Sequence, residues 1–74
     1  MAGTIRAGAE EPSAGPRIRD GRRSAGLTQQ QLAEATGVSR QTVISVETGD
    51  YSPSVYLALR IARALGTSVE ALWG

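Results

Sequence analysis

The stretch TQQQLAEATGVSRQTVISVET, from Thr28 to Thr48, predicts two short helices joined by a tight turn. Thr28 can cap the first helix, and Gln31, three residues later, can return the contact, which is the capping-box spacing. Gly37 is expected to end this helix, because glycine adopts the left-handed conformation at little steric cost. Ser39 is well placed to cap the second helix. The stretch therefore reads as helix, turn and helix.

The two predicted helices have one apolar face and one polar face. Apolar residues recur at helical spacing and are expected to point inward: Leu32, Ala33, Val38, Val43 and Val46. Four residues of the second helix are left pointing away from the core: Arg40, Gln41, Ile44 and Ser45. A helix that exposes arginine, glutamine and serine near its N-terminus can read DNA bases.

Length and composition exclude several classes of protein. Seventy-four residues allow one small domain with a modest core. The chain has no cysteine, no histidine and no paired-carboxylate spacing, so we expect no catalytic residues, no metal site and no cofactor. No apolar run approaches membrane-spanning length, and the N-terminus lacks a hydrophobic signal core. We therefore expect a cytoplasmic protein.

The basic residues are all arginine and are unevenly placed. Half of the eight lie in the short segment 17–23. The net charge of +1 does not by itself indicate a nucleic-acid binder. We attribute the absence of lysine chiefly to codon bias, although the planar guanidinium group also suits contacts to phosphate.

Residues 1–16, MAGTIRAGAEEPSAGP, predict a disordered N-terminal tail. Their Ala, Gly and Pro content provides too little apolar surface to offset the entropy of ordering. A functional alternative is that Arg6 lies in an arm that enters the minor groove of DNA. Glu10 and Glu11 nearby disfavour that alternative, because they oppose its charge.

A first helix is expected from Arg17 to Ala25, with Pro16 marking its start and Gly26 its end. Gly21 occupies an inward position of this helix and supplies no side chain to pack. Either a neighbouring residue fills that space or this helix is loosely held.

The remainder of the chain predicts two more helices. One covers residues 54–65 after the turn DYSPS, and Gly66 ends it. Its expected core stripe is Val55, Ala58, Ile61, Ala62 and Leu65. Thr67 and Glu70 have capping-box spacing for a last short helix, which holds Val69, Leu72 and Trp73. Nothing alternates with a period of two, so the chain is predicted to be all-α.

Taken together, residues 17–73 resemble a phage-repressor-like (Xre/Cro-type) helix-turn-helix domain. The residues that carry the resemblance are Arg22, Gly26-Leu27-Thr28-Gln29, Leu32-Ala33, Gly37-Val38-Ser39, Val43, Val46-Glu47, Gly49, Pro53-Ser54, and Ile61-Ala62 with Ala64-Leu65-Gly66. The resemblance implies a compact, lambda-repressor-like bundle of five helices over residues 17–74. Its second and third helices would form the helix-turn-helix.

The resemblance also implies roles for particular residues. Four would contact base edges in the major groove: Arg40, Gln41, Ile44 and Ser45. Three would contact backbone phosphates: Thr28, Gln29 and Ser39. Arg22 and Glu47 would form a structural ion pair between the first and third helices.

Three positions depart from the family pattern, and one of them is Gly21, which bears on stability rather than on function. Ile44 stands where relatives usually carry a polar residue, and it would either pack on a thymine methyl group or be an ordinary exposed apolar residue. Asp50 stands near a position where relatives often carry a basic residue. A carboxylate facing phosphate would weaken binding, so this loop is expected to lie further from the DNA backbone.

The sequence thus predicts a sequence-specific transcriptional regulator, most simply a repressor, that reads double-stranded DNA with the helix 39–48. We expect a homodimer on a palindromic operator. Candidate dimer-surface residues are Tyr56, Leu57, Leu59, Leu72 and Trp73. Leu59, Leu72 and Trp73 could instead complete the core, which we favour for Leu72. Bound to its operator, such a protein would be associated with the nucleoid.

A second hypothesis places the protein in a different functional class. The same domain occurs in antitoxins and in adaptor-type interaction proteins, which bind a partner protein such as a toxin. A degenerate domain that has lost DNA binding is a third alternative, and the polar edge of Arg40, Gln41 and Ser45 argues against it.

Overall fold

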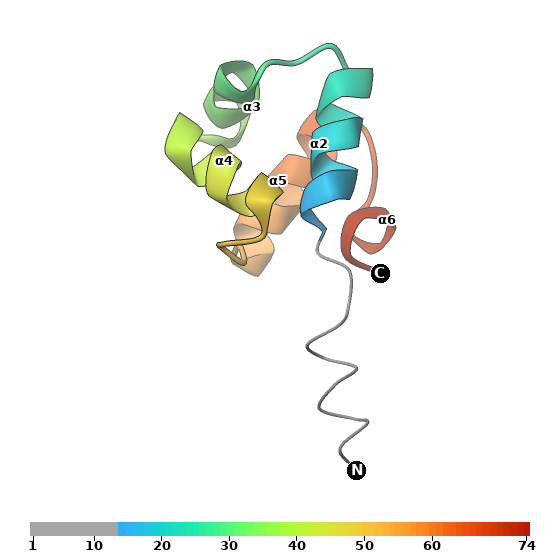
Figure 1. Ribbon diagram of the computed structural model, residues 1–74. Coiled ribbons are helices and arrows are strands. Elements are labelled where there is room, and N and C mark those ends of the chain that lie inside the picture. Colours follow the sequence, from blue (N-terminus) through green and yellow to red (C-terminus); the bar gives the residue numbers. More distant parts are fainter. Residues whose placement is uncertain (1–13) are drawn as a thin grey trace.

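Five helices follow one another between Ala14 and Gly74, the part of the chain that the computed structural model describes (Figure 1). They are α2 (Gly15–Ser24), α3 (Gln29–Thr36), α4 (Arg40–Thr48), α5 (Val55–Leu65) and α6 (Val69–Trp73). The expected all-α, five-helix fold is confirmed. Of the expected tail over residues 1–16, residues 1–13, with Arg6, lie outside the described residues.

The first helix begins earlier than the sequence predicted. α2 starts at Gly15 rather than Arg17, so Gly15 and Pro16 are helical. Gly15 is buried, and a Cβ atom on it would overlap the backbone carbonyl of Glu47. The glycine therefore allows the start of α2 to pack closely against the last turn of α4. Sequence alone could not reveal this long-range contact.

Side-chain caps fix where the later helices begin. Thr28 Oγ1 accepts a hydrogen bond from the N–H of Gln31 at 3.0 Å, and Gln31 Oε1 accepts one from the N–H of Thr28 at 2.8 Å. This is the predicted capping box. Ser39 caps α4 by accepting from the N–H of Thr42 at 3.1 Å, and Ser54 caps α5 in the same way. Because Thr28 and Ser39 set the first residues of α3 and α4, they also set which side chains the two helices present.

The residue that caps the last helix lies one position after the predicted one. Ser68, not Thr67, caps α6, and its hydroxyl accepts from the N–H of Ala71 at 3.1 Å. Thr67 instead belongs to the end of α5, where its N–H donates to the carbonyl of Ala62 at 2.9 Å. Thr67 thus lies in the turn that ends α5, and α6 begins one residue later than the sequence predicted.

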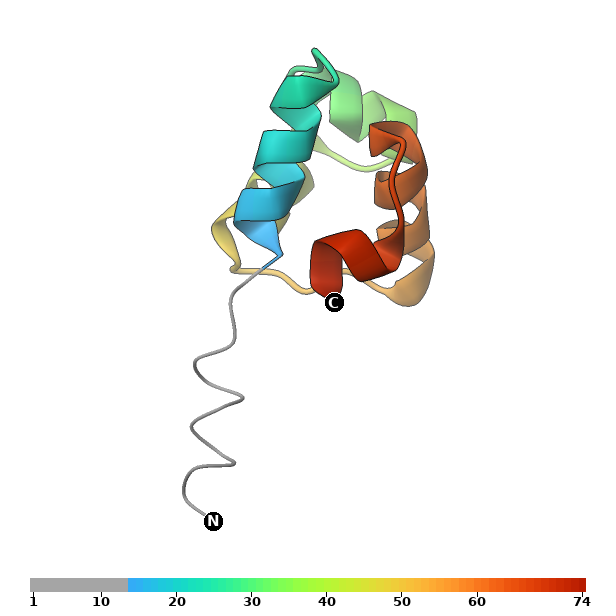
Figure 2. The same cartoon turned by 90° about the vertical axis from the view of Figure 1, so that its right-hand side faces the viewer.

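The buried apolar residues come from all five helices. They are Ile18, Leu32, Ala33, Val43, Val46, Leu57, Ala58, Ile61, Ala62 and Leu72. α3 packs on α4 and α5, α2 packs on the same two helices, and α6 packs on α5. Figure 2 shows the C-terminal helix returning toward the start of α2. There Arg17 Nη1 donates to the carbonyl of Gly74 at 3.0 Å.

One side of α5 was assigned wrongly from the sequence. Val55 was expected in the core but is 72% exposed, whereas Leu57 was expected outside and is 7% exposed. At 100° per residue the stripe centres on Ala58, Ile61 and Leu65, so Val55 and Leu57 lie at its opposite margins. The other helices cover the side of α5 on which Leu57 lies. Val55, the first residue of α5, is left in solvent.

The space at Gly21 is filled by a neighbouring helix. Leu65 Cδ1 lies 3.2 Å from the position that a Cβ atom on Gly21 would take. Of the two alternatives from the sequence, the first is therefore correct, and α2 and α5 pack closely at this point. No helix among residues 14–74 is long and apolar enough to cross a membrane.

Candidate nucleic-acid interface

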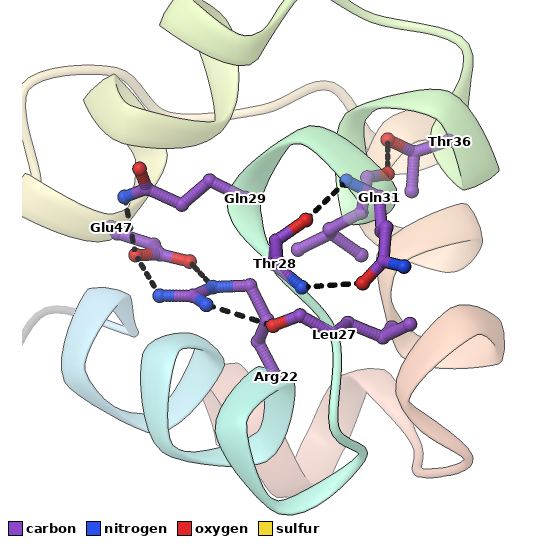
Figure 3. A network of polar contacts seen from close by, with 8 residues as sticks. Arg22, Leu27, Thr28, Gln29, Gln31, Thr36 and Glu47 are labelled. Atoms are coloured by element: carbon purple, nitrogen blue, oxygen red, sulfur yellow. Dashed lines mark hydrogen bonds and ion pairs between the residues drawn. The ribbon is translucent and has the colours of Figure 1, made fainter.

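α3 and α4 form a compact pair joined by a three-residue turn. Gly37 has a φ of +74° in the left-handed region, as the helix end requires, and the N–H of Val38 donates to the carbonyl of Ala33 at 3.0 Å. Thr36 was not singled out from the sequence, yet it is fully buried. Its hydroxyl donates to the carbonyl of Leu32 at 2.7 Å, so this buried hydroxyl group is satisfied (Figure 3).

The four residues expected to contact bases share one face of α4. Residues 44 and 45 lie one helical turn after residues 40 and 41, and all four lie opposite the buried Val43 and Val46. Arg40 and Gln41, in the first turn, are exposed, and Ile44 and Ser45 are half-buried. Among residues 14–74, Arg40 has no carboxylate partner. The guanidinium and amide groups at the start of α4 are therefore available to a ligand.

Two open hollows flank this face of α4. One has a volume of about 450 Å³ and is lined by Arg22, Arg23, Leu27, Thr28, Gln29, Gln30 and Arg40. The other has a volume of about 320 Å³ and is lined by Ser39, Gln41, Thr42, Ser45, Asp50 and Tyr51. We call them the basic hollow and the α4–loop hollow. The structure brings two expected phosphate contacts, Thr28 and Gln29, together with Arg40 in the basic hollow, and it places Ser39 in the α4–loop hollow.

A buried polar network holds α2, α3 and α4 together (Figure 3). Arg22 Nε donates to Glu47 Oε2 at 2.6 Å, and Arg22 Nη2 donates to Glu47 Oε1 at 3.2 Å. The two side chains are only 10% and 4% exposed. Arg22 Nη1 also donates to the carbonyl of Leu27 at 2.9 Å, and so holds the segment that leads into α3. The pair therefore ties three elements of the fold together.

Gln29 links this network to the start of α3. Its Nε2 donates to Glu47 Oε1 at 3.2 Å, a contact between two helices that could not be predicted from the sequence. The amide of Gln29 is therefore held in one orientation. The first backbone N–H groups of a helix have no partner within the helix. Thr28 satisfies the N–H of Gln31, so within residues 14–74 the N–H groups of Gln29 and Gln30 are left without a partner, and both residues line the basic hollow.

Asp50 is held back against the end of α4. Its Oδ2 accepts a hydrogen bond from Thr48 Oγ1 at 3.1 Å. The same loop brings Tyr51 to the α4–loop hollow, a residue that had no predicted role. The two hollows thus differ in charge, because the α4–loop hollow includes a carboxylate, and none is among the residues 14–74 that line the basic hollow.

These features define the class of protein. In this all-α domain, the second and third helices are capped, and arginine and glutamine lie on one outer face. This arrangement is typical of a DNA-binding domain. The helix-turn-helix family (HTH_3) matches residues 18–72. The chain belongs to this Xre/Cro-type helix-turn-helix family, whose members are DNA-binding transcriptional regulators and not enzymes.

Individual relatives agree with that assignment. A helix-turn-helix-type transcriptional regulator of Methanothermobacter thermautotrophicus is 63% identical over 49 residues, which cover 66% of this chain and 71% of that protein. The immunity repressor protein of Bacillus phage phi105 is 40% identical over 60 residues, which cover 81% of this chain but only 42% of the repressor.

Solved structures show the same fold. The restriction-modification controller protein C.AhdI from Aeromonas hydrophila matches with a TM-score of 0.77 and 35% identity, over 81% of this chain and 91% of that one. The clp gene regulator ClgR from Corynebacterium glutamicum matches with the same TM-score and 33% identity, over 81% of this chain and 64% of that one. The lambda-repressor-like fold that the sequence predicted is therefore confirmed.

Proposed function

We propose that this protein is a sequence-specific regulator, and most simply a repressor, that places α4 in the major groove of its operator. The observation that carries the proposal is the face of α4, where Arg40 and Gln41 are exposed and without acidic partners among residues 14–74. The guanidinium group of Arg40 matches O6 and N7 of guanine, and the amide of Gln41 matches N6 and N7 of adenine. The phage immunity repressor among the relatives supports the repressor role.

The half-buried residues of this face have supporting roles in the proposal. Ser45 lies one turn after Gln41 and can donate or accept a hydrogen bond at a base edge. Ile44 is half-buried, so its outer methyl groups remain free to contact a thymine methyl group. Three residues would fix the register of α4 by contacting phosphates: Thr28, Gln29 and Ser39. The free N–H groups at the start of α3 favour an anion there.

A homodimer is part of the proposal. Two copies would place their α4 helices in successive major grooves, about 34 Å apart, on a palindromic operator. Of the candidate dimer residues, Leu57 and Leu72 are buried in the core and are excluded. Tyr56 is 77% exposed and Leu59 41%, so the outer side of α5 remains the candidate surface. A regulator of this kind acts on chromosomal DNA and therefore in the cytoplasm.

Binding to a protein partner, as in antitoxins, is the alternative. It rests on the same exposed apolar side of α5, with Val55, Tyr56 and Leu59. Copurification with the product of an adjacent gene would favour it. The protein alone binding its operator as a dimer would favour the regulator.

Binding measurements with purified protein test the proposal. A duplex selected for binding should bind much more tightly than random DNA, and the affinity should fall as salt rises, because phosphate contacts release counterions. Equal affinity for all sequences would overturn the proposal.

A further inference from the structure

The basic hollow contains an arginine that neither the buried network nor the reading face uses. This is Arg23, in the last turn of α2, which lines the hollow together with Arg40 and the start of α3. We propose that Arg23 binds a DNA backbone phosphate at the basic hollow. The inference rests on the proposed DNA binding, and it adds a fourth phosphate-binding residue, on a further helix, to the three proposed at positions 28, 29 and 39.

The neighbouring arginine shows why Arg23 is available. Arg22 is buried, and its guanidinium group donates to Glu47 and to the carbonyl of Leu27. Successive residues of a helix point about 100° apart, so Arg22 points inward and Arg23 outward. Arg23 is exposed, and it makes no ion pair or side-chain hydrogen bond within residues 14–74. Its planar set of donors is therefore free for a phosphate.

The composition of the basic hollow selects an anion. Arg23 and Arg40, both without a partner among residues 14–74, line this hollow from α2 and α4. Gln29 and Gln30 line it as well, and the first backbone N–H groups of a helix have no partner within the helix. None of the residues 14–74 that line this hollow is acidic, whereas Asp50 lines the α4–loop hollow. Phosphate therefore fits the basic hollow better than it fits the other.

The position of Arg23 on α2 argues for a phosphate and not a base as its ligand. α4 carries the residues proposed to enter the major groove, and α2 packs behind it. A side chain on α2 would lie beside the face of α4 proposed to contact bases. There it would meet the edge of the major groove, where the sugar–phosphate backbone lies. A simpler explanation is that Arg23 only offsets the negative end of the α2 dipole. That explanation predicts an effect on stability and none on DNA affinity.

The test compares Arg23→Ala with Arg60→Ala on specific and on random duplex, across a range of salt concentrations. Arg60 is also an exposed arginine without a partner among residues 14–74, but it lines a separate hollow beside Ala35. Arg23→Ala should weaken binding to both duplexes by the same factor and reduce the slope of log K against log salt by about 0.9. At about 0.1 M salt that slope corresponds to roughly an eightfold loss of affinity. Arg23→Lys should restore part of the affinity and the slope.

The outcomes separate this inference from the proposed function. If wild-type protein shows sequence preference and Arg23→Ala binds like Arg60→Ala, the assignment of Arg23 is wrong while the proposed function stands. If Arg23→Ala changes the preferred sequence, Arg23 contacts a base and the phosphate assignment is wrong. If wild-type protein binds all sequences equally, the proposed function itself fails. Thermal unfolding of each variant shows that it is folded before binding is compared.

Discussion

Replacing Glu47 tests the buried network that holds α4 against α2 and α3. The Glu47 side chain is 4% exposed, and three N–H groups converge on its two carboxylate oxygens, from Arg22 Nε, Arg22 Nη2 and Gln29 Nε2. Glu47→Ala leaves the buried guanidinium group of Arg22 without its anion. Stranding one partner of a buried pair costs about 3–5 kcal/mol.

That loss is a large part of the total free energy of unfolding expected for a domain of this size. Small domains lie at the low end of total stabilities of about 5–15 kcal/mol. A loss of 3 kcal/mol corresponds to a fall in Tm of at least about 12 °C for a domain of 60–100 residues. Glu47→Gln should cost less, about 1–3 kcal/mol, because the amide keeps one oxygen for the three donors but turns an NH₂ group toward at least one of them.

Urea denaturation followed by circular dichroism measures these free energies of unfolding. Glu34→Ala is the matched control. Glu34 is exposed, and within residues 14–74 its carboxylate accepts a hydrogen bond only from Gln30 Nε2, so the variant should change stability by no more than about 0.5 kcal/mol. The double variant Arg22→Met, Glu47→Leu should lose less than the sum of the two single losses, because no charge is left stranded. If Glu47→Ala were as stable as Glu34→Ala, the pair would contribute no more than a surface salt bridge does, and it would not hold α4 in place.

Three further predictions concern single positions. Gly21→Ala should stabilise the protein by roughly 0.5–1 kcal/mol, because alanine has the better helix propensity and the facing atom is the flexible end of Leu65; a lower Tm would show that Leu65 cannot move. In urea denaturation, Leu57→Ala should lower the free energy of unfolding by about 2–5 kcal/mol and Val55→Ala by less than about 0.5 kcal/mol. The reverse order would show that Val55, and not Leu57, packs in the core. Gln29→Ala should weaken binding to specific and random duplex by similar factors in fluorescence anisotropy, and a changed base preference would contradict its assignment to phosphate.

Local chemistry explains most of what the sequence predicted about the fold. Capping residues and helix-ending glycines act over three to five residues, so Thr28, Ser39 and Gly37 could be assigned without tertiary structure. The apolar periodicity of α3 and α4 likewise identified their buried residues, Leu32, Ala33, Val43 and Val46. These two helices form the part of the fold that positions the candidate site.

Features that depend on contacts between distant segments could not be predicted. Whether Val55 or Leu57 is buried depends on where the other helices end, and both positions fit a helical stripe. The filling of the space at Gly21 by Leu65 joins residues 44 positions apart. The bond from Gln29 to Glu47 also joins separate helices, so periodicity carries no signal of it. The cluster of arginines at 17–23 was visible in the sequence, but only the structure separates the buried Arg22 from the exposed Arg23.

Selection from a random pool of duplexes shows whether α4 reads DNA bases through Arg40. Wild-type protein should enrich a palindromic motif whose half-sites are about 10 base pairs apart, centre to centre. Arg40→Ala should lose about 1–3 kcal/mol of binding free energy and relax the preference at one base pair of each half-site. If Arg40→Ala selects the unchanged motif, Arg40 does not read a base. If the wild-type protein selects no motif, it does not bind DNA sequence-specifically.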